Sequence, residues 1–440
     1  MSRRRKRFWW GAGALTLGLG LALWIVPSWS RSPRRVVLPD GSTLTLKSVS
    51  FGTNHYAPPA FRNFLLRQVP SGLAAKLRLD RPQLLVTPTP HLTTWWEWRN
   101  RVTDREPLIF MVDDAGALGP AGGILPVSGD RAMYAVIWKS FPRRAETLRL
   151  RVYQTSATRD PKPFAELRLG NPIRRSFAQW SPEPLPNSRR LDDLEFSLVG
   201  FQIEMTRGLP GFDWCESPQP RATLAFHITC GGRVDQSWRT DGFVLSDATG
   251  NEIGLPGEPP WVADPQTESW FPRGEAVGGK WVVSFLWPLW LDEPAYRLRV
   301  EFVRQPDAPF PPEDVLEVKA VPVPAADGIS MINVGTNLHG FEVKPLALVG
   351  EHATLPGREH DVFGQTTLEV EVPPLPDGLR FDVVQVTDDQ GQRAVPMAGA
   401  GSQSYGFRIP EGARMVDLKV AVSNRRVVEF LVKPTLRTAK

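Results

Sequence analysis

The sequence predicts an all-β protein in which one N-terminal transmembrane helix precedes three tandem β-sandwich domains. Three observations predict this fold class. A two-part unit, an Asp-x-x-Gly turn followed by a strand of alternating apolar and polar residues, occurs three times in the same order. The 440 residues include 43 Pro and 37 Gly, which leave few stretches for long helices. A long apolar run stands near the N-terminus.

The turn of the repeated unit has an Asp three residues before a Gly, directly after apolar and β-branched residues. The three copies lie at residues 113–116, 247–250 and 388–391. The Asp side chain can accept hydrogen bonds from the backbone, and the Gly can adopt a conformation that a Cβ would oppose. Each preceding run is therefore a strand that reverses at the Asp.

The second part of the unit is a strand with one buried and one solvated face. Its apolar residues occupy every other position, with charged residues between them. These apolar residues are Leu148, Leu150 and Val152; Leu298, Val300 and Phe302; and Val416, Leu418 and Val420. An aromatic residue precedes each strand (Trp138, Trp287 and Phe407), and residues 165–169, 316–320 and 428–432 form a closing strand in each unit. Strands at this spacing indicate antiparallel sandwiches.

The N-terminal apolar run, Phe8–Val26, predicts a membrane anchor. Its 19 residues span about 28 Å as a helix, close to the hydrocarbon thickness of a bilayer. Five basic residues precede the run and three follow it, which places the N-terminus in the cytoplasm and the domains outside. A cleaved signal peptide is the alternative, because Ser28-Trp29-Ser30 offers a small-x-small site, but its apolar region is usually shorter.

The formal net charge of +5 comes from the N-terminus. Eight basic residues and no acid lie in residues 1–35, and removing these eight from the 52 basic residues leaves 44 against 47 acidic ones, a net charge of −3. The domains therefore lack the basic character that nucleic-acid binding requires.

Domain boundaries are predicted from composition. Residues 1–35 are the basic tip and anchor, 36–180 the first sandwich with short helices at 61–68 and 71–79, 181–190 a Pro-rich linker, 191–320 the second sandwich, 321–336 a further linker and 337–440 the third sandwich. Linkers rich in Pro are stiff and hold domains apart.

Cys215 and Cys230 are the only cysteines and predict a disulfide. They flank a Pro-containing turn in the second sandwich, and outside the cytoplasm such a pair can oxidise. The bond would close a loop of about 15 residues and contribute about 3 kcal/mol on the chain-entropy model. Two buried thiols are the alternative.

Aromatic and imidazole side chains give two further candidate sites. Trp261 and Trp270 lie in the stretch of the second unit that least resembles the other copies, so they are candidates for a partner or sugar surface; packing of the loop on its own domain is the alternative. His352 and His360 stand in an acidic loop where an unrecognised hydrolase site is conceivable. The spacing predicts no metal site and no cofactor.

The whole pattern resembles bacterial envelope proteins built from one N-terminal anchor and tandem immunoglobulin-like β-sandwich domains. The residues that carry the resemblance are Phe8–Val26, the three Asp-x-x-Gly turns and the Leu-x-Val strands. The resemblance implies a membrane-anchored, extracytoplasmic structural or protein-binding protein without catalytic activity, with an envelope protein or glycan as partner. A carbohydrate-binding protein that uses Trp261 and Trp270 is the first alternative, and a hydrolase is the second.

Overall fold

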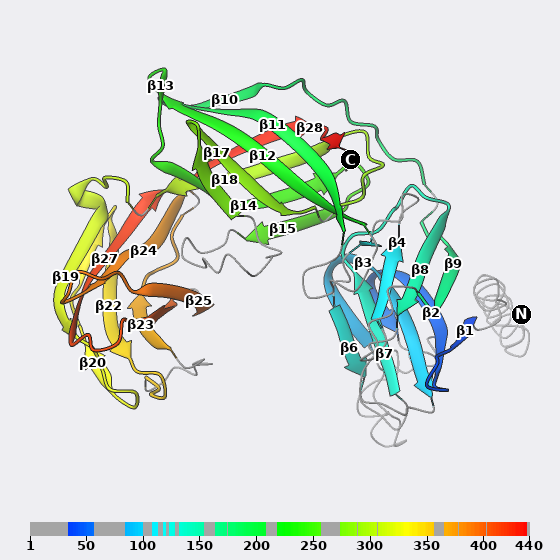
Figure 1. Cartoon of the computed structure of the whole chain (residues 1–440), viewed down its shortest axis with the longest axis horizontal. Coiled ribbons are helices and arrows are strands. Elements are labelled where there is room, and N and C mark those ends of the chain that lie inside the picture. The colour runs from blue at the N-terminus through cyan, green and yellow to red at the C-terminus, as the bar shows by residue number, and fades with distance from the viewer. Residues whose placement is uncertain are drawn as a thin grey trace, which may run out of the picture.

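The computed structural model of the chain is all-β in the part that it describes (Figure 1). The described residues are 34–56, 84–99, 108–112, 118–119, 123–127, 132–153, 163–173, 175–207, 218–256, 273–287, 289–305, 307–355, 365–376, 378–401 and 403–437. Strands and one short 3-10 helix, η2 (Pro312–Asp314), make up their regular secondary structure.

The first sandwich packs a five-stranded sheet on a four-stranded one. The first sheet has the order β1 (Arg34–Val37), β2 (Thr43–Tyr56), β3 (Leu84–Arg99), β7 (Ala132–Trp138), β6 (Gly123–Val127). The second has the order β5 (Leu118–Gly119), β4 (Leu108–Val112), β8 (Thr147–Tyr153), β9 (Ala165–Gly170). Trp96 and Trp138 of one sheet and Leu148 and Leu150 of the other are buried in one core, as the alternating patterns require.

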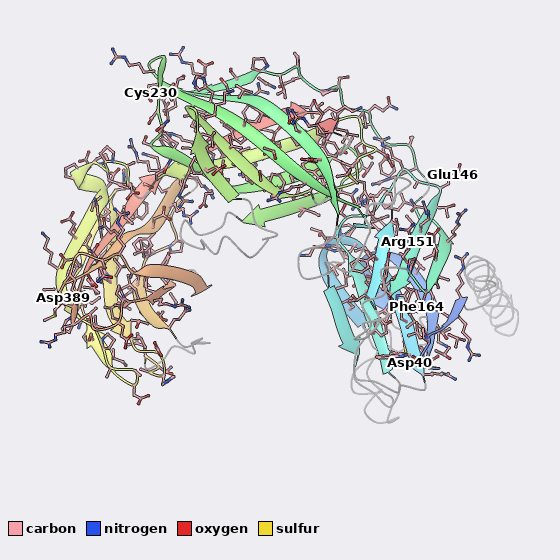
Figure 2. All side chains as sticks on the ribbon, in the orientation of Figure 1. Asp40, Glu146, Arg151, Phe164, Cys230 and Asp389 are labelled. Carbon is pink, nitrogen blue, oxygen red and sulfur yellow. The ribbon has the colours of Figure 1, made fainter. Side chains whose placement is uncertain are left out.

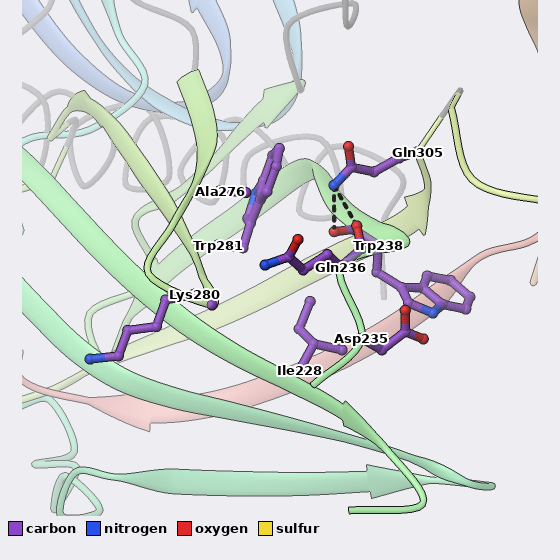
Figure 3. A pocket seen from close by; sticks show the side chains of 9 residues that line it. Ile228, Asp235, Gln236, Trp238, Ala276, Lys280, Trp281 and Gln305 are labelled. Atoms are coloured by element: carbon purple, nitrogen blue, oxygen red, sulfur yellow. Dashed lines mark hydrogen bonds between the residues drawn. The ribbon is translucent and has the colours of Figure 1, made fainter. Parts of the chain in front are cut away.

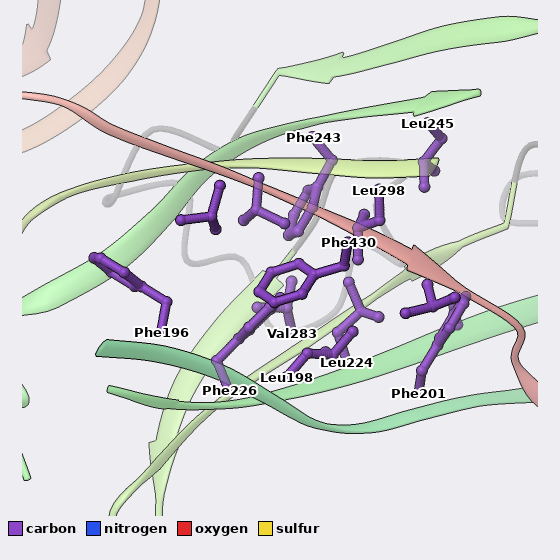
Figure 4. Close-up of a cluster of buried hydrophobic side chains, with 14 of the residues drawn as sticks. Phe196, Leu198, Phe201, Leu224, Phe226, Phe243, Leu245, Val283, Leu298 and Phe430 are labelled. Carbon is purple, nitrogen blue, oxygen red and sulfur yellow. The ribbon is translucent and has the colours of Figure 1, made fainter. Parts of the chain in front are cut away.

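The second sandwich has the same two-layer construction. One sheet has the order β10 (Asn187–Leu191), β11 (Leu194–Arg207), β12 (Pro218–Cys230), β17 (Lys280–Leu286), β16 (Arg273–Val277), with β13 (Arg233–Val234) beside β12. The other has the order β15 (Glu252–Pro256), β14 (Trp238–Asp247), β18 (Tyr296–Arg304), β28 (Arg426–Val432). Figure 4 shows Phe226 and Val283 of the first sheet meeting Leu298 and Phe430 of the second.

The third sandwich is built from the remaining strands. One sheet has the order β20 (Ile329–Met331), β22 (Phe341–Val349), β23 (Thr366–Glu371), β26 (Ser404–Arg408), β25 (Val395–Gly401), with β21 (Thr336–Leu338) also on β22. The other has the order β19 (Val315–Pro322), β27 (Met415–Asn424), β24 (Leu379–Asp388). A last strand, β29 (Thr435–Arg437), pairs in parallel with β11 of the second sandwich.

The strand order is that of immunoglobulin-type sandwiches. In the second sandwich, β11, β12, β17 and β16 stand in the A-B-E-D order of that fold, and β14, β18 and β28 stand in its C-F-G order. The Tyr296 hydroxyl, at the start of the F-like strand, donates to the Trp290 carbonyl six residues upstream. This contact is the tyrosine corner of such domains.

The third sandwich is inserted in the chain between β18 and β28 of the second sandwich. In the first sandwich the closing strand, β9, pairs with β8, the strand before it. In contrast, β19 follows β18 in the chain yet pairs with β27, and β28 follows β27 yet pairs with β18. The chain therefore leaves the second sandwich, forms the whole third sandwich, and returns to close the second.

Two of the three predicted turns lie in the described residues and are confirmed. The Asp247 carboxylate accepts hydrogen bonds from the backbone of Thr249 and Asn251, and the Asp388 carboxylate accepts them from residues 390 and 392. Gly250 and Gly391 have φ of 90° and 79°, which a Cβ would oppose. The turn at 113–116 lies outside the described residues.

This insertion corrects the predicted placement of the two closing strands. Residues 316–320 belong with the third sandwich and residues 428–432 with the second, because an alternating pattern specifies a buried face but not the neighbour. The proposed linkers are also partly strand: 187–190 lies in β10, and β20 and part of β19 lie in 321–336. The predicted helices at 61–68 and 71–79 lie outside the described residues.

No helix among the described residues is long and apolar enough to cross a membrane. The anchor expected at Phe8–Val26 lies outside them.

Candidate functional site

The turn at Asp247 is a buried joint between the first two sandwiches. Asp247, Thr249 and Asn251 are only 2%, 1% and 1% exposed. The Asp247 Oδ1 atom accepts from the Thr249 amide at 2.8 Å, the Thr249 hydroxyl at 2.6 Å and the Asn251 amide at 3.1 Å. Three donors on one carboxylate oxygen hold the turn in a single conformation.

Asn251 makes the hydrogen bonds that join the second sandwich to the first. Its Nδ2 donates to the Phe141 carbonyl at 3.0 Å, and its Oδ1 lies 3.3 Å from the Phe141 amide nitrogen, which donates to it. The same Nδ2 also donates to Asp247 Oδ2 at 2.7 Å. One carboxamide thus pairs with both backbone groups of a residue in the other domain, which fixes the distance and the rotation between them.

Arg143 fills the space beside this contact. Its Nη1 donates to the Thr249 carbonyl at 3.1 Å, and its guanidinium lies 5.1 Å from the Phe141 ring centre and 5.3 Å from that of Phe51. Burial lowers the pKa of Arg143, and the charge of Asp247 opposes that shift. The buried cation is therefore held by a carbonyl and two aromatic faces, and the nearby charge of Asp247 favours it.

A second ion pair and an aromatic anchor flank the joint. Arg144 Nε lies 2.9 Å and 3.0 Å from the two carboxylate oxygens of Glu293, whose pKa is raised by burial. Trp290, which follows the E-like strand of the second sandwich, is buried in the core cluster of the first. Polar contacts and an apolar side chain therefore act together across this interface.

The second and third sandwiches meet through a different charged cluster. Arg380 of β24 pairs with Asp241 of β14, and Arg239 Nη1 lies 3.4 Å from the same carboxylate. Burial lowers the pKa of Arg239 to about 10. Arg425, between β27 and β28, donates to Glu301 of β18 at 3.0 Å. The crossing of the chain between these sandwiches is thus flanked by paired charges.

A cavity of ligand size lies in the third sandwich. It has a volume of about 500 Å³ and lies where β19 ends and β27 begins, lined by residues such as Glu351, Gln365 and Arg408. A second hollow, beside Trp238 and Trp281, has a volume of about 10 Å³, which is close to the least that one water needs (Figure 3). Of these two, the first has room for a ligand.

Of the cysteine and tryptophan candidates, the structure describes Cys230. Cys230 stands at the end of β12, and its Sγ donates to Asp193 Oδ2 at 3.1 Å (Figure 2). This hydrogen bond raises the pKa of the Cys230 thiol. Cys215, Trp261 and Trp270 lie outside the described residues, so the disulfide and the tryptophan surface stay predictions.

The histidine candidates are also split. His352 lies in the loop after β22, where its amide donates to the Ala326 carbonyl at 2.8 Å, whereas His360 lies outside the described residues. In the described part of the chain, His, Cys, Asp and Glu residues form no group of three or more that could hold a metal ion.

The residues that form the two contacts between sandwiches could not be predicted from the sequence. Asp247 was identified as a turn residue shared by three copies, but nothing in its pattern indicates that Asn251 and Thr249 are buried against another domain. One signal was available: Arg143-Arg144 directly follows Phe141-Pro142, an unusual pair of cations beside apolar residues.

The comparisons with known proteins give little further. No protein-family model matches the chain, and no curated protein matches it. Among solved structures, a three-immunoglobulin-domain structure of titin domains I67–I69, in an E-to-A mutated variant, is 10% identical. That match covers 78% of this chain and 92% of the titin chain with a TM-score of 0.11, too low to carry an argument.

Proposed function

We propose that this protein is a membrane-anchored structural protein of the cell envelope that holds three sandwich domains in fixed relation and binds another envelope component. The observation that carries the proposal is the insertion of the whole third sandwich between β18 and β28 of the second. The chain therefore joins these two sandwiches twice, between β18 and β19 and between β27 and β28, and two connections restrict relative motion more than a single linker does.

The buried joint between the first and second sandwiches supports the same function. Asn251, Arg143 and Trp290 each cross from one domain to the other and are buried there. An interface of this kind restricts the relative motion that is usual between linked domains. Fixed geometry is what a protein needs when it spaces or positions a partner rather than closing around a substrate.

The membrane anchor remains part of this proposal and rests on the sequence. Phe8–Val26 has the length and apolar character of a transmembrane helix, and the basic residues before it favour an N-terminus in the cytoplasm. The domains would then lie on the outer side of the cytoplasmic membrane.

The test is the location and partnership of the full chain. Expressed in a bacterial host, the protein should stay with the membrane after carbonate extraction, and protease added to spheroplasts should digest the domains. Crosslinking at the spheroplast surface, followed by purification and mass spectrometry, should recover the same envelope component in repeated experiments. A full-length chain found in the soluble fraction, with no reproducible crosslinked component, would overturn the proposal.

A further inference from the structure

The third sandwich holds a preformed cavity that the joints do not use. It lies at the end of the sandwich where Pro322 pairs with Met415, whereas the joint to the second sandwich lies at the opposite end, where Leu379 pairs with Asn424. Its volume of about 500 Å³ falls within the usual range of ligand sites, about 300–1,000 Å³.

Two largely buried side chains present polar groups to the cavity. Gln365 and Thr366 line it and are only 7% and 8% exposed. Among the described residues, neither the Gln365 carboxamide nor the Thr366 hydroxyl has a hydrogen-bond partner. Neither group is among the polar atoms that are closed off from solvent, so both open to the cavity, where a bound molecule can supply their hydrogen-bond partners.

Two glycines let the backbone pack closely around the cavity. A Cβ at Gly406 would lie 2.4 Å from the Gln365 amide nitrogen, so only glycine there lets the carboxamide lie across β26. A Cβ at Gly350 would lie 2.1 Å from the Ala325 carbonyl oxygen. Gly350 donates instead to the Gly328 carbonyl at 2.9 Å, which holds the connection between β19 and β20 against the cavity wall.

The chemistry of the lining selects the class of ligand. The charged lining residues are Glu351 and Arg408, both exposed, so the lining carries no net charge and does not favour a phosphate or a free cation. The aromatic lining residue, Phe407, is 1% exposed, so it offers no ring face on which a sugar could stack.

We infer that this cavity binds an extended, uncharged peptide segment of the envelope partner. In an extended chain the N–H and C=O of one residue point to the same side, and a carboxamide can donate to the carbonyl and accept from the amide. Main-chain hydrogen bonds of this kind supply affinity, while the Val323 and Ile409 side chains that line the cavity can contact the partner's side chains. The inference rests on the proposed function and names the partner surface within it.

The test uses the full chain in detergent and a library of random heptapeptides displayed on phage. We expect enrichment of a peptide family, and the synthetic, fluorescein-labelled peptide should bind measurably by anisotropy. Gln365→Leu, which keeps the size but removes the carboxamide, should weaken binding at least tenfold, and Thr366→Val should weaken it less. Gly406→Ala, which forces the carboxamide from its place, should also weaken binding.

Gln385→Leu is the matched control, because Gln385 lies on β24 in the opposite sheet and does not line the cavity. It should bind the peptide as the native chain does, and unchanged melting temperatures should show that every variant is folded. Failure to enrich any peptide, or equal binding by Gln365→Leu, overturns the inference. Displacement of the peptide by chitin oligosaccharides would instead identify the cavity as a sugar site. If Gln365→Leu still crosslinks the envelope component normally, the partner docks elsewhere and only this inference fails.

Discussion

Phe430→Ala should destabilise the second sandwich, although residue 430 follows the whole third sandwich in the chain. Phe430 lies on β28, is 0% exposed, and its ring centre is 6.2 Å from that of Phe226 in the facing sheet (Figure 4). Truncation of a buried Phe costs about 3–5 kcal/mol, counting the cavity that it leaves. This corresponds to a rise of about 100-fold or more in the unfolded fraction of the domain that contains it.

Hydrogen exchange of the full chain, followed by mass spectrometry, measures this change domain by domain, because amide exchange in stable strands reports the free energy of opening. In Phe430→Ala, peptides from β11, β12 and β18 should exchange faster. Val318→Ala is the matched control, because Val318 is buried on β19 and should affect peptides from β24 and β27 instead. If Phe430→Ala loosens the third sandwich and spares the second, the placement of β28 in the second sandwich is refuted.

Three other predictions concern the joint, pH and the cysteines. Asn251→Ala should cost about 1–3 kcal/mol for each buried group that it leaves unpaired, and small-angle scattering should show a broader range of angles between the first two sandwiches; an unchanged profile would contradict a fixed joint. Burial lowers the pKa of His55 and His91, so below about pH 6.5 the unfolded chain binds more protons than the folded one. The free energy of unfolding, measured by urea titration, should therefore be highest above that pH and decrease as the pH falls through it. In His55→Gln the decrease should be smaller. Thiol titration of the unfolded, unreduced chain decides between the predicted Cys215–Cys230 disulfide and the Cys230 thiol that donates to Asp193: no free sulfhydryl would show the disulfide, and two would show that both cysteines are unpaired.

The fold class and the individual strands could be predicted from local patterns. Alternation in β8, β18 and β27 identified the buried faces of Leu150, Val300 and Leu418, because a strand with one side on a core must repeat every second residue. The turn at Asp247 was predictable for the same reason, since Asp and Gly at that spacing satisfy a local geometry.

The pairing between strands and the joints between domains could not be predicted in this way. β19 and β28 both present alternating apolar residues, so either could close either sandwich, and the connection between β18 and β19 is long enough for both arrangements. Burial of Asn251 depends on the Phe141 backbone, which is distant in the sequence. Gln365 reads as an ordinary polar residue before a strand, and only its surroundings make its carboxamide notable.

The return of β28 to the second sandwich has a consequence for biosynthesis. The ribosome makes the entire third sandwich between β18 and β28, so the second sandwich lacks its closing strand until the last part of the chain emerges. Until then the backbone groups on one edge of β18 have no partner strand, and a chain that stalls or is truncated before residue 426 leaves that edge exposed. Quality-control proteases that recognise such open edges would therefore act as a check on whether the chain has been made to its final strands.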